Sequence, residues 1–192
     1  MKPEYTEQER KQLLELARTT LETVVKSGKM PHVSPETFAG HLSEKRGCFV
    51  TLTVRGRLRG CIGHIFAQEA LYRAVMDNAR SAALEDPRFL PVTPEELKSI
   101  HIEISVLSEP RPLEFSSPQD LLEKLVPGRD GVVLKLGWRR STFLPQVWEQ
   151  LPDKEMFLNH LAAKAGAPSS AWREPGTEVL IYHVEAFEEP EH

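Results

Sequence analysis

The chain has 192 residues, of which 40% are hydrophobic and 27% are charged, and its formal net charge is -4. This length allows one large domain or two small lobes with a substantial core, and the negative charge makes nucleic acid an unlikely partner. No apolar run is long enough to span a membrane, the start lacks the apolar core of a secretion signal, and two cysteines do not make a disulfide framework. We therefore expect a cytoplasmic protein with reduced thiols.

Hydrophobic periodicity predicts two long helices in the first half of the chain. Apolar residues recur at helical spacing over 6–27 and over 69–84. Thr6 and Glu9 form a capping-box pattern at the start of the first helix. The second helix is rich in alanine and serine, which permits close approach to a sheet. Cap and proline signals add short helices over 34–42 and 93–98.

Alternating residues predict three strands. Residues 47–54 form the first, and a two-residue turn at Arg55-Gly56 returns the chain as a partner strand over 57–63. Residues 100–107 form the clearest strand, with isoleucine and valine on one side and His101, Glu103 and Ser105 on the other. A turn this tight places Val54 opposite Arg57 and Val50 opposite Cys61.

In that register the two cysteines lie on one face of the hairpin. Cys48 is one diagonal step from Cys61, at roughly 7–8 Å, which is too far for an unstrained disulfide. The two thiols would then share an environment without bonding. A slip of one residue would send them to opposite faces.

Composition changes at the stiff connector 108–112, which carries two prolines. Beyond it the pattern predicts a mixture of short strands and helices. The expected strands are 113–115, 132–136, 139–144 and 179–187, and the expected helices are 117–126, 145–151 and 153–165. The irregular alternation and the hairpins predict an α+β protein with mainly antiparallel pairing. We expect a larger subdomain over about 1–109 plus 177–192, and a smaller inserted subdomain over about 110–176, with its own short sheet.

The segment Leu58-Arg59-Gly60-Cys61-Ile62-Gly63 is the first candidate for a functional site, because it combines a thiol, a fixed charge and closely spaced glycines. The glycines either form a phosphate-binding turn or mark a bulge or close backbone approach, and their spacing favours the second interpretation. Cys61 is either a reactive thiol, activated by Arg59 and by a base such as His64 or His101, or a small buried hydrophobe.

Two further groups of residues need an interpretation. Cys61 and His64 have weak metal-ligand spacing, because a regular strand points them to opposite faces, and we expect no resident metal. Asp86 and Arg88 form either a helix-end salt bridge or part of an anion site beside Arg59. The three tryptophans all lie in the second lobe, where core packing is the ordinary interpretation. They are Trp138, Trp148 and Trp172.

The hexapeptide 58–63 is specific enough to suggest a family. Together with Gly47-Cys48-Phe49-Val50-Thr51-Leu52, Asp86-Pro87-Arg88-Phe89 and the strand 102–108, it resembles the AMMECR-type domain family, also called AmmeMemoRadiSam system protein A. The resemblance extends through Gly128-Arg129-Asp130-Gly131 into the segments 143–148 and 164–166 and to Trp172, and so covers nearly the whole chain.

The resemblance implies a single domain over 1–192 with two subdomains and a cleft between them that the hexapeptide faces. The ligand-binding residues carried over by position are Leu58, Arg59, Gly60, Cys61, Ile62 and Gly63, with Asp86 and Arg88. The family name implies Memo-type and radical-SAM proteins as partners. No cysteine-rich iron–sulfur motif is present, so radical chemistry would belong to a partner, and we expect no cofactor.

Two functions follow from these observations. The first is an accessory or substrate-binding component of a modification system, which grips a protein or other large substrate in the cleft. The second is an enzyme that uses Cys61 in thiol chemistry.

Overall fold

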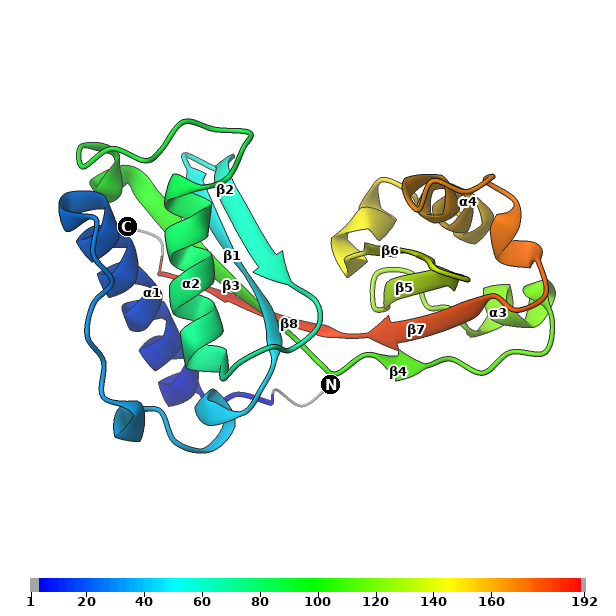
Figure 1. Ribbon diagram of the computed structural model, residues 1–192, viewed down its shortest axis with the longest axis horizontal. Coiled ribbons are helices and arrows are strands. Elements are labelled where there is room, and N and C mark those ends of the chain that lie inside the picture. The colour runs from blue at the N-terminus through cyan, green and yellow to red at the C-terminus, as the bar shows by residue number, and fades with distance from the viewer. Residues whose placement is uncertain (1–3, 191–192) are drawn as a thin grey trace. The chain divides into compact units, whose positions relative to one another are not determined.

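The computed structural model describes residues 4–190 and has the predicted α+β class, with two four-stranded antiparallel sheets (Figure 1). The chain divides into two compact units. Unit 1 contains the residues up to Leu107 and those from Glu185 onwards, and unit 2 contains Ser108–Val184. Among the described helices, none combines the length and the apolar character that crossing a bilayer requires.

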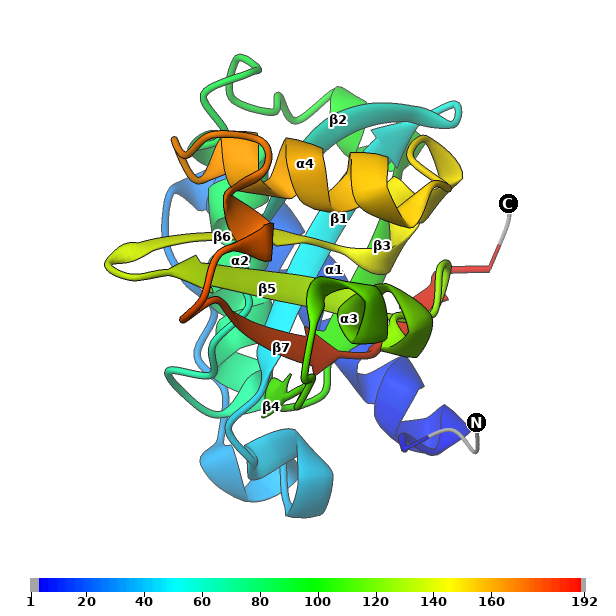
Figure 2. The same cartoon turned by 90° about the vertical axis from the view of Figure 1, so that its right-hand side faces the viewer.

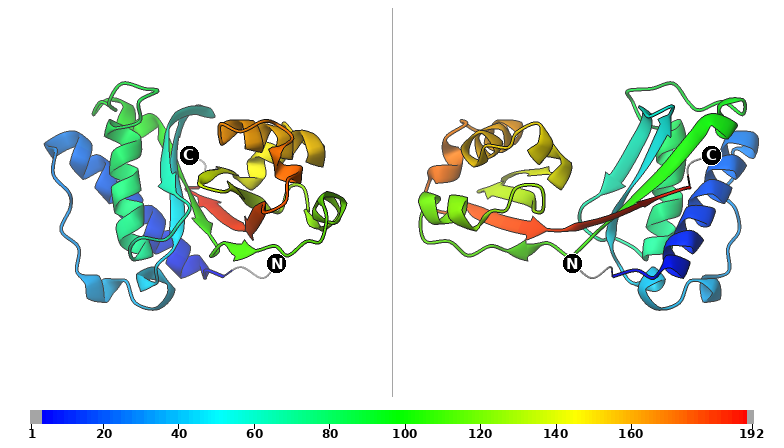
Figure 3. Two further views of the ribbon diagram at one scale, coloured as in Figure 1. Left: turned by 45° about the vertical axis from the view of Figure 1, so that its right-hand side comes forward. Right: turned by 180° about the vertical axis from the view of Figure 1, so that it is seen from behind.

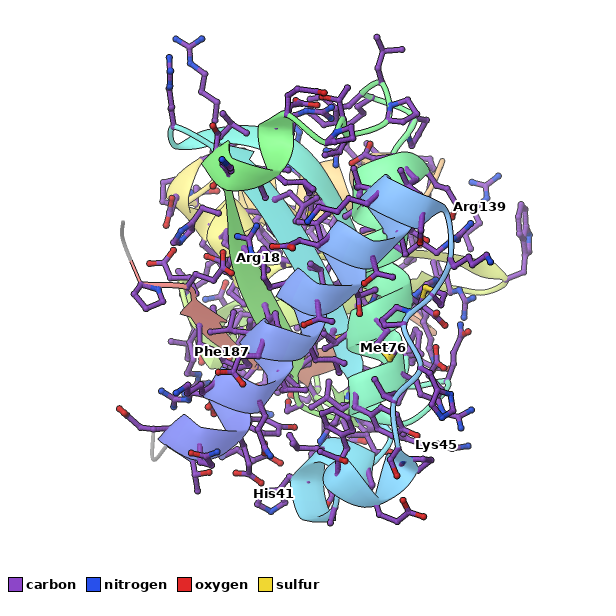
Figure 4. The ribbon with its side chains drawn as sticks, turned by 90° about the vertical axis from the view of Figure 1, so that its left-hand side faces the viewer. Arg18, His41, Lys45, Met76, Arg139 and Phe187 are labelled. Carbon is purple, nitrogen blue, oxygen red and sulfur yellow. The ribbon has the colours of Figure 1, made fainter. Side chains whose placement is uncertain are left out.

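Unit 1 consists of two helices that lie side by side over one face of a sheet (Figure 4). The sheet has the strand order β2-β1-β3-β8. Its helices are α1 (Glu7–Ser27) and α2 (Leu71–Leu84), and its strands are β1 (Gly47–Val54), β2 (Arg57–His64), β3 (Ile100–Leu107) and β8 (Val184–Glu188). Short 3-10 turns occupy the two predicted short helices, as η1 (Pro35–Thr37), η2 (Gly40–Ser43) and η3 (Glu96–Ser99).

Local sequence signals set the ends of α1. The Thr6 side chain accepts a hydrogen bond from the Glu9 N–H, and the Glu9 carboxylate accepts one from the Thr6 N–H, which confirms the capping box. Gly28 ends the helix with φ 71°, a conformation that glycine adopts without strain. The helix buries a stripe of residues against the sheet. These are Leu13, Leu16, Ala17, Thr20, Leu21 and Val24.

The predicted register of the β1–β2 hairpin is wrong by one residue. Val54 pairs with Arg57 as expected, but the pairing shifts between Leu52 and Thr53, so that Val50 faces Ile62 and Thr51 faces Cys61. The extra residue is Arg59, which forms a β-bulge beside Gly60. Beyond the bulge every side chain of β2 changes face relative to the prediction. Cys48 therefore points into the core, and Cys61 lies on the opposite face of the sheet.

Glycine is required at position 60 by the packing of α2. A Cβ atom there would collide with the carbonyl oxygen of Ala82. The small residues of α2 thus allow the helix to approach β2 closely, as their small size predicts. The interpretation of Gly60 as a bulge and a close backbone approach is confirmed.

Unit 2 has a sheet with the strand order β4-β7-β5-β6, with α3 and α4 beside it (Figure 2). Its strands are β4 (Arg111–Pro112), β5 (Gly131–Leu136), β6 (Arg139–Phe143) and β7 (Glu178–Tyr182). Its helices are α3 (Pro118–Lys124) and α4 (Lys154–Lys164), with the 3-10 turns η4 (Pro145–Glu149) and η5 (Ala171–Arg173). In the core, the Trp148 ring stacks on Phe157 with centroids 3.6 Å apart.

The prediction of one final strand over 179–187 is wrong. The segment divides at His183 into β7, which belongs to the second sheet, and β8, which lies next to β3 in the first (Figure 3). The His183 N–H donates to Ser108 Oγ and its carbonyl accepts the Ser108 N–H, both at 2.9 Å. Because its backbone groups bond to Ser108, His183 belongs to neither β7 nor β8. Unit 1 is therefore rejoined at Glu185, not at the expected position 177.

Two smaller expectations in unit 2 also differ from the structure. The strand expected at 113–115 is not formed there; the two-residue strand β4 ends at Pro112, directly before it. Trp148 and Trp172 are buried core residues, as interpreted, with 3% and 1% of their surface exposed. Trp138 is 87% exposed, so core packing is wrong for this residue.

Candidate functional site

The backbone of Cys61 lies at the free edge of the first sheet, because β2 is the outermost strand. Its N–H donates to Asp86 Oδ2 at 2.9 Å, and its carbonyl accepts from Arg88 Nη2 at 3.1 Å. Asp86 and Arg88 follow the C-terminus of α2 directly. The segment after α2 thus takes the place of a neighbouring strand and covers the sheet edge at the hexapeptide.

Asp86 has four donors around its carboxylate. Oδ2 accepts from the Cys61 N–H and from Arg88 Nη2 (2.7 Å), and Oδ1 accepts from the Arg88 N–H (3.1 Å) and from Arg88 Nε (2.9 Å). Only 4% of the residue is exposed. The Arg88 guanidinium, helped by the two N–H groups, holds the pKa of this carboxyl well below its ordinary range. Asp86 is therefore a fixed negative charge that pairs with Arg88.

Arg59 takes a different direction from Cys61. Its guanidinium forms a bidentate pair with Glu96 of η3, at 2.7 Å from Nε to Oε1 and 3.0 Å from Nη2 to Oε2. Both guanidinium groups lie near the Phe89 ring, whose centroid is 5.9 Å from Arg59 Cζ and 5.5 Å from Arg88 Cζ. The bulge therefore directs Arg59 towards the loop after α2 and away from the face that holds the Cys61 thiol.

The Cys61 side chain belongs to a row that crosses three strands. Thr51 of β1 pairs with Cys61 of β2 on one side and with Glu103 of β3 on the other. The Thr51 hydroxyl donates to Cys61 Sγ at 3.3 Å. Burial and the nearby Glu188 carboxylate raise the pKa of Glu103. Glu103 lies two strand spacings from Cys61, a Cα separation of about 10 Å.

Neither histidine considered as a base is placed to serve Cys61. His64 pairs with Cys48 and so lies on the opposite face of β2 from Cys61. His101 shares the face of Cys61 but pairs with Thr53, one row further along, and its Nε2 lies 3.2 Å from Glu188. Within residues 4–190 no group of three His, Cys, Asp or Glu side chains is arranged to hold a metal ion.

The two cysteines have different environments, and both are free. Cys48 is 1% exposed, and its sulfur accepts a hydrogen bond from Asn78 Nδ2 at 3.3 Å. Burial raises the pKa of the Cys48 thiol to about 12. Cys61 is partly exposed. The prediction that the two thiols share an environment is wrong, because the bulge separates them onto opposite faces.

The structure brings together most of the residues predicted for the site and shows what each one contacts. Gly63 pairs with Phe49, whose ring fills the space that a Cβ at position 63 would need. Ile62 packs against the core, and Leu58 on the other face is 44% exposed. Two residues of the site were not predicted, namely Thr51 as the partner of the thiol and Glu96 as the partner of Arg59. The cap signal over 93–98 marked the segment that contains Glu96, but not its pairing with Arg59.

Comparison with known proteins identifies the family. The AMMECR1 family model matches residues 14–187. The chain belongs to the AMMECR1 family. A protein of Methanosarcina acetivorans is 40% identical over 97% of this chain and 94% of its own length. One of Methanocaldococcus jannaschii is 40% identical, covering 91% of this chain and 87% of its own.

A solved structure agrees with this assignment. The crystal structure of the uncharacterized protein PH0010 from Pyrococcus horikoshii matches with a TM-score of 0.84 at 35% identity, covering 96% of this chain and 93% of that one. Family membership and fold are thereby shown for this AMMECR1 chain. The ligand-binding roles of the hexapeptide, Asp86 and Arg88, and the cleft between the subdomains, stay predictions.

Proposed function

We propose that this AMMECR1 protein is a binding component of a modification system, and that it recognises a large substrate or partner at the hexapeptide edge of unit 1. The observation that carries the proposal is the set of contacts around Cys61. A cysteine nucleophile needs a base within hydrogen-bond reach. In residues 4–190 the thiol has a hydrogen bond from the Thr51 hydroxyl and an electrostatic interaction with the Arg88 guanidinium, and neither group is a base. Recognition therefore accounts for the arrangement better than catalysis does.

Exposed apolar side chains beside Arg59 support recognition of a macromolecule. Leu58 is 44% exposed, and Leu90, next to Phe89 in the loop after α2, is 84% exposed. Arg59 also contacts the Pro91 carbonyl, at 3.4 Å, so this loop and β2 form one continuous surface. Aromatic, arginine and apolar groups of this kind are typical of protein-binding patches.

The rigid backbone at Cys61 fits the same function. Asp86 and Arg88 fix both polar groups of the Cys61 peptide, so the surface is organised before a partner arrives. Preorganisation lowers the entropic cost of association. We infer Memo-type and radical-SAM proteins as the first partners to test, because the family name associates them in one system.

The second candidate is an enzyme that uses Cys61 in thiol chemistry. The hydrogen bond from Thr51 favours it, because it fixes the orientation of the thiol. In this function a bound substrate or a partner would supply the base.

One set of variants separates the two functions. Binding to purified Memo-type and radical-SAM proteins is measured by pull-down for wild type, Cys61→Ser and Arg59→Ala, with Arg57→Ala as the matched control at an exposed arginine of the same strand. Recognition predicts lost binding in Arg59→Ala, because the bonds from Arg59 to Glu96 and to the Pro91 carbonyl hold the loop that carries Leu90. Cys61→Ser and Arg57→Ala should bind as wild type. If Cys61→Ser folds and binds normally yet abolishes activity in the pathway, the result supports the second function, an enzyme that uses Cys61. Absence of binding by the wild type, with and without the pathway's small molecules, refutes the proposed partners.

A further inference from the structure

The chain passes from one unit to the other at two places, between Leu107 and Ser108 and between Val184 and Glu185. Figure 1 shows these links as the segment between β3 and β4 and the segment between β7 and β8. On the side of unit 2 the links are bonded to each other. The Ser108 N–H donates to the His183 carbonyl, and the His183 N–H donates to Ser108 Oγ, both at 2.9 Å. Where these bonds are intact, one link cannot move without the other.

The side chain of His183 connects this pair of links to the interior of unit 2. Its Nε2 lies 3.2 Å from Oδ1 of Asp130, whose side chain is fully buried. The carboxylate also accepts hydrogen bonds from Arg129 Nε at 2.7 Å and from the Val126 N–H at 2.9 Å. Burial disfavours the charged form, but these donors outweigh it and hold the pKa of Asp130 below its ordinary value. Because an ionised carboxylate only accepts, the proton of this bond is on His183 Nε2.

The motif Gly128-Arg129-Asp130-Gly131 also holds the residue before His183. Gly131 pairs with Tyr182 across β5 and β7, and a Cβ atom at position 131 would collide with the Tyr182 ring. Glycine is therefore required at 131 so that the ring, which is 1% exposed, can pack against the backbone. Asp130 and Gly131 thus fix two consecutive residues, Tyr182 and His183, directly before the chain leaves unit 2.

From these contacts we propose that the Asp130–His183 bond is the latch of a hinge between the two units, a role that does not depend on the proposed function. With the latch closed, Ser108 and His183 move as part of unit 2, and bending is confined to the two short links. With the latch open, the end of β7 separates from Asp130 and the flexible connection lengthens, so the units sample a wider range of mutual orientations. The His183 side chain is 31% exposed, so the latch can open without unfolding the core of unit 2.

The first test is hydrogen exchange in the full-length protein. His183→Ala removes the bond to Asp130, and we expect the amides at positions 108 and 183 to exchange at least about tenfold faster. The amides of β5, an interior strand of the same sheet, should exchange as in wild type. His183→Gln keeps a donor close to the position of Nε2 and should restore protection. His160→Ala, at an exposed histidine of α4, is the matched control and should change nothing at the two links.

The second test measures the distance between the units by pulsed electron paramagnetic resonance. Spin labels are attached to Lys11→Cys in unit 1 and Met156→Cys in unit 2, both at exposed side chains, in a Cys61→Ser background. We expect His183→Ala to broaden the distance distribution, and His183→Gln and His160→Ala to keep the width found with the wild-type histidines.

Three results would overturn the proposal. The first is an unchanged width in His183→Ala. The second is exchange of the β5 amides that accelerates as much as exchange at positions 108 and 183, because the bond would then act on the stability of unit 2 and not on the hinge. The third is a His183→Gln variant that behaves as His183→Ala in both tests. Loss of partner binding at the hexapeptide edge would affect none of these measurements.

Discussion

Replacing Asp86 by asparagine tests the role assigned to this residue, because the change keeps the shape and removes the charge. Each carboxylate oxygen of Asp86 accepts two hydrogen bonds, one from the side chain of Arg88 and one from a backbone N–H. An amide has one acceptor oxygen and one donor group. Whichever way the asparagine side chain turns, its NH₂ group therefore faces two N–H donors, and two of the four bonds are lost.

The expected loss of stability follows from these contacts. Hydrogen bonds to charged groups contribute roughly 1.5–3 kcal/mol each. The Arg88 side chain is 53% exposed, so water replaces part of what it loses, whereas the Asp86 side chain is 2% exposed. We expect the free energy of unfolding to fall by about 2–4 kcal/mol. For a chain of this length that corresponds to a Tm lower by about 5–15 °C.

The assay uses two probes that report on different units. The longer helices, α1 with 21 residues and α2 with 14, both belong to unit 1, so far-UV circular dichroism in urea mainly follows that unit. All three tryptophans belong to unit 2, and their fluorescence follows it. Glu85→Gln, at the exposed neighbouring carboxylate, is the control and should change stability by less than about 0.5 kcal/mol. A loss below about 1 kcal/mol in Asp86→Asn would refute the reasoning.

The pH dependence gives an independent check. Because the pKa of Asp86 is lowered in the folded protein, its contribution is fully present above the unfolded value of about 3.9 and is lost as the pH falls through the folded value. The difference in stability between wild type and Asp86→Asn should therefore be constant from about pH 5 to pH 8 and narrow below about pH 4. A difference that widens on acidification would contradict the assignment.

Three further predictions follow. Gly60→Ala should lower the free energy of unfolding by about 2–3 kcal/mol, because the new Cβ meets the Ala82 carbonyl. An unchanged Tm in a thermal melt would show that β2 and α2 can separate. Ellman's reagent should label Cys61 in the native protein while Cys48, with its pKa of about 12, reacts only after unfolding; equal native rates would disprove the burial of Cys48. Trp148→Phe should cost about 2 kcal/mol through its lost bond to the Asp130 carbonyl at 2.7 Å, checked by urea denaturation, and Trp148→Phe as stable as wild type would contradict it.

Elements fixed by local signals could be predicted from the sequence. The capping box and Gly28 set the ends of α1, and alternation with a two-residue turn predicted the β1–β2 hairpin. These features depend on residues a few positions apart. The glycines of β2 indicated a bulge or a close backbone approach but not which residue is extra. The register beyond the turn could not be predicted, because the position of the bulge depends on packing against α2.

The break at His183 escaped prediction for a similar reason. Residues 179–187 have continuous strand character, and the choice between two sheets is made by partners elsewhere in the chain. Ser108 bonds the backbone of His183, and the ring Nε2 lies 3.2 Å from Asp130, which is fully buried. The sequence also marked Asp86 and Arg88 as a pair without showing that their acceptors and donors lie on the Cys61 backbone, 25 positions earlier.

The contacts of the hexapeptide also limit what kind of ligand it can recognise. Arg59 is paired with Glu96, and Arg88 with Asp86, so neither guanidinium is an open anion site. An anionic ligand at this edge would have to break a bidentate pair, which raises the cost of binding. The groups exposed at this edge are Leu58, Leu90 and, in part, Cys61. Binding there should therefore depend on apolar burial and shape, and should change little with salt.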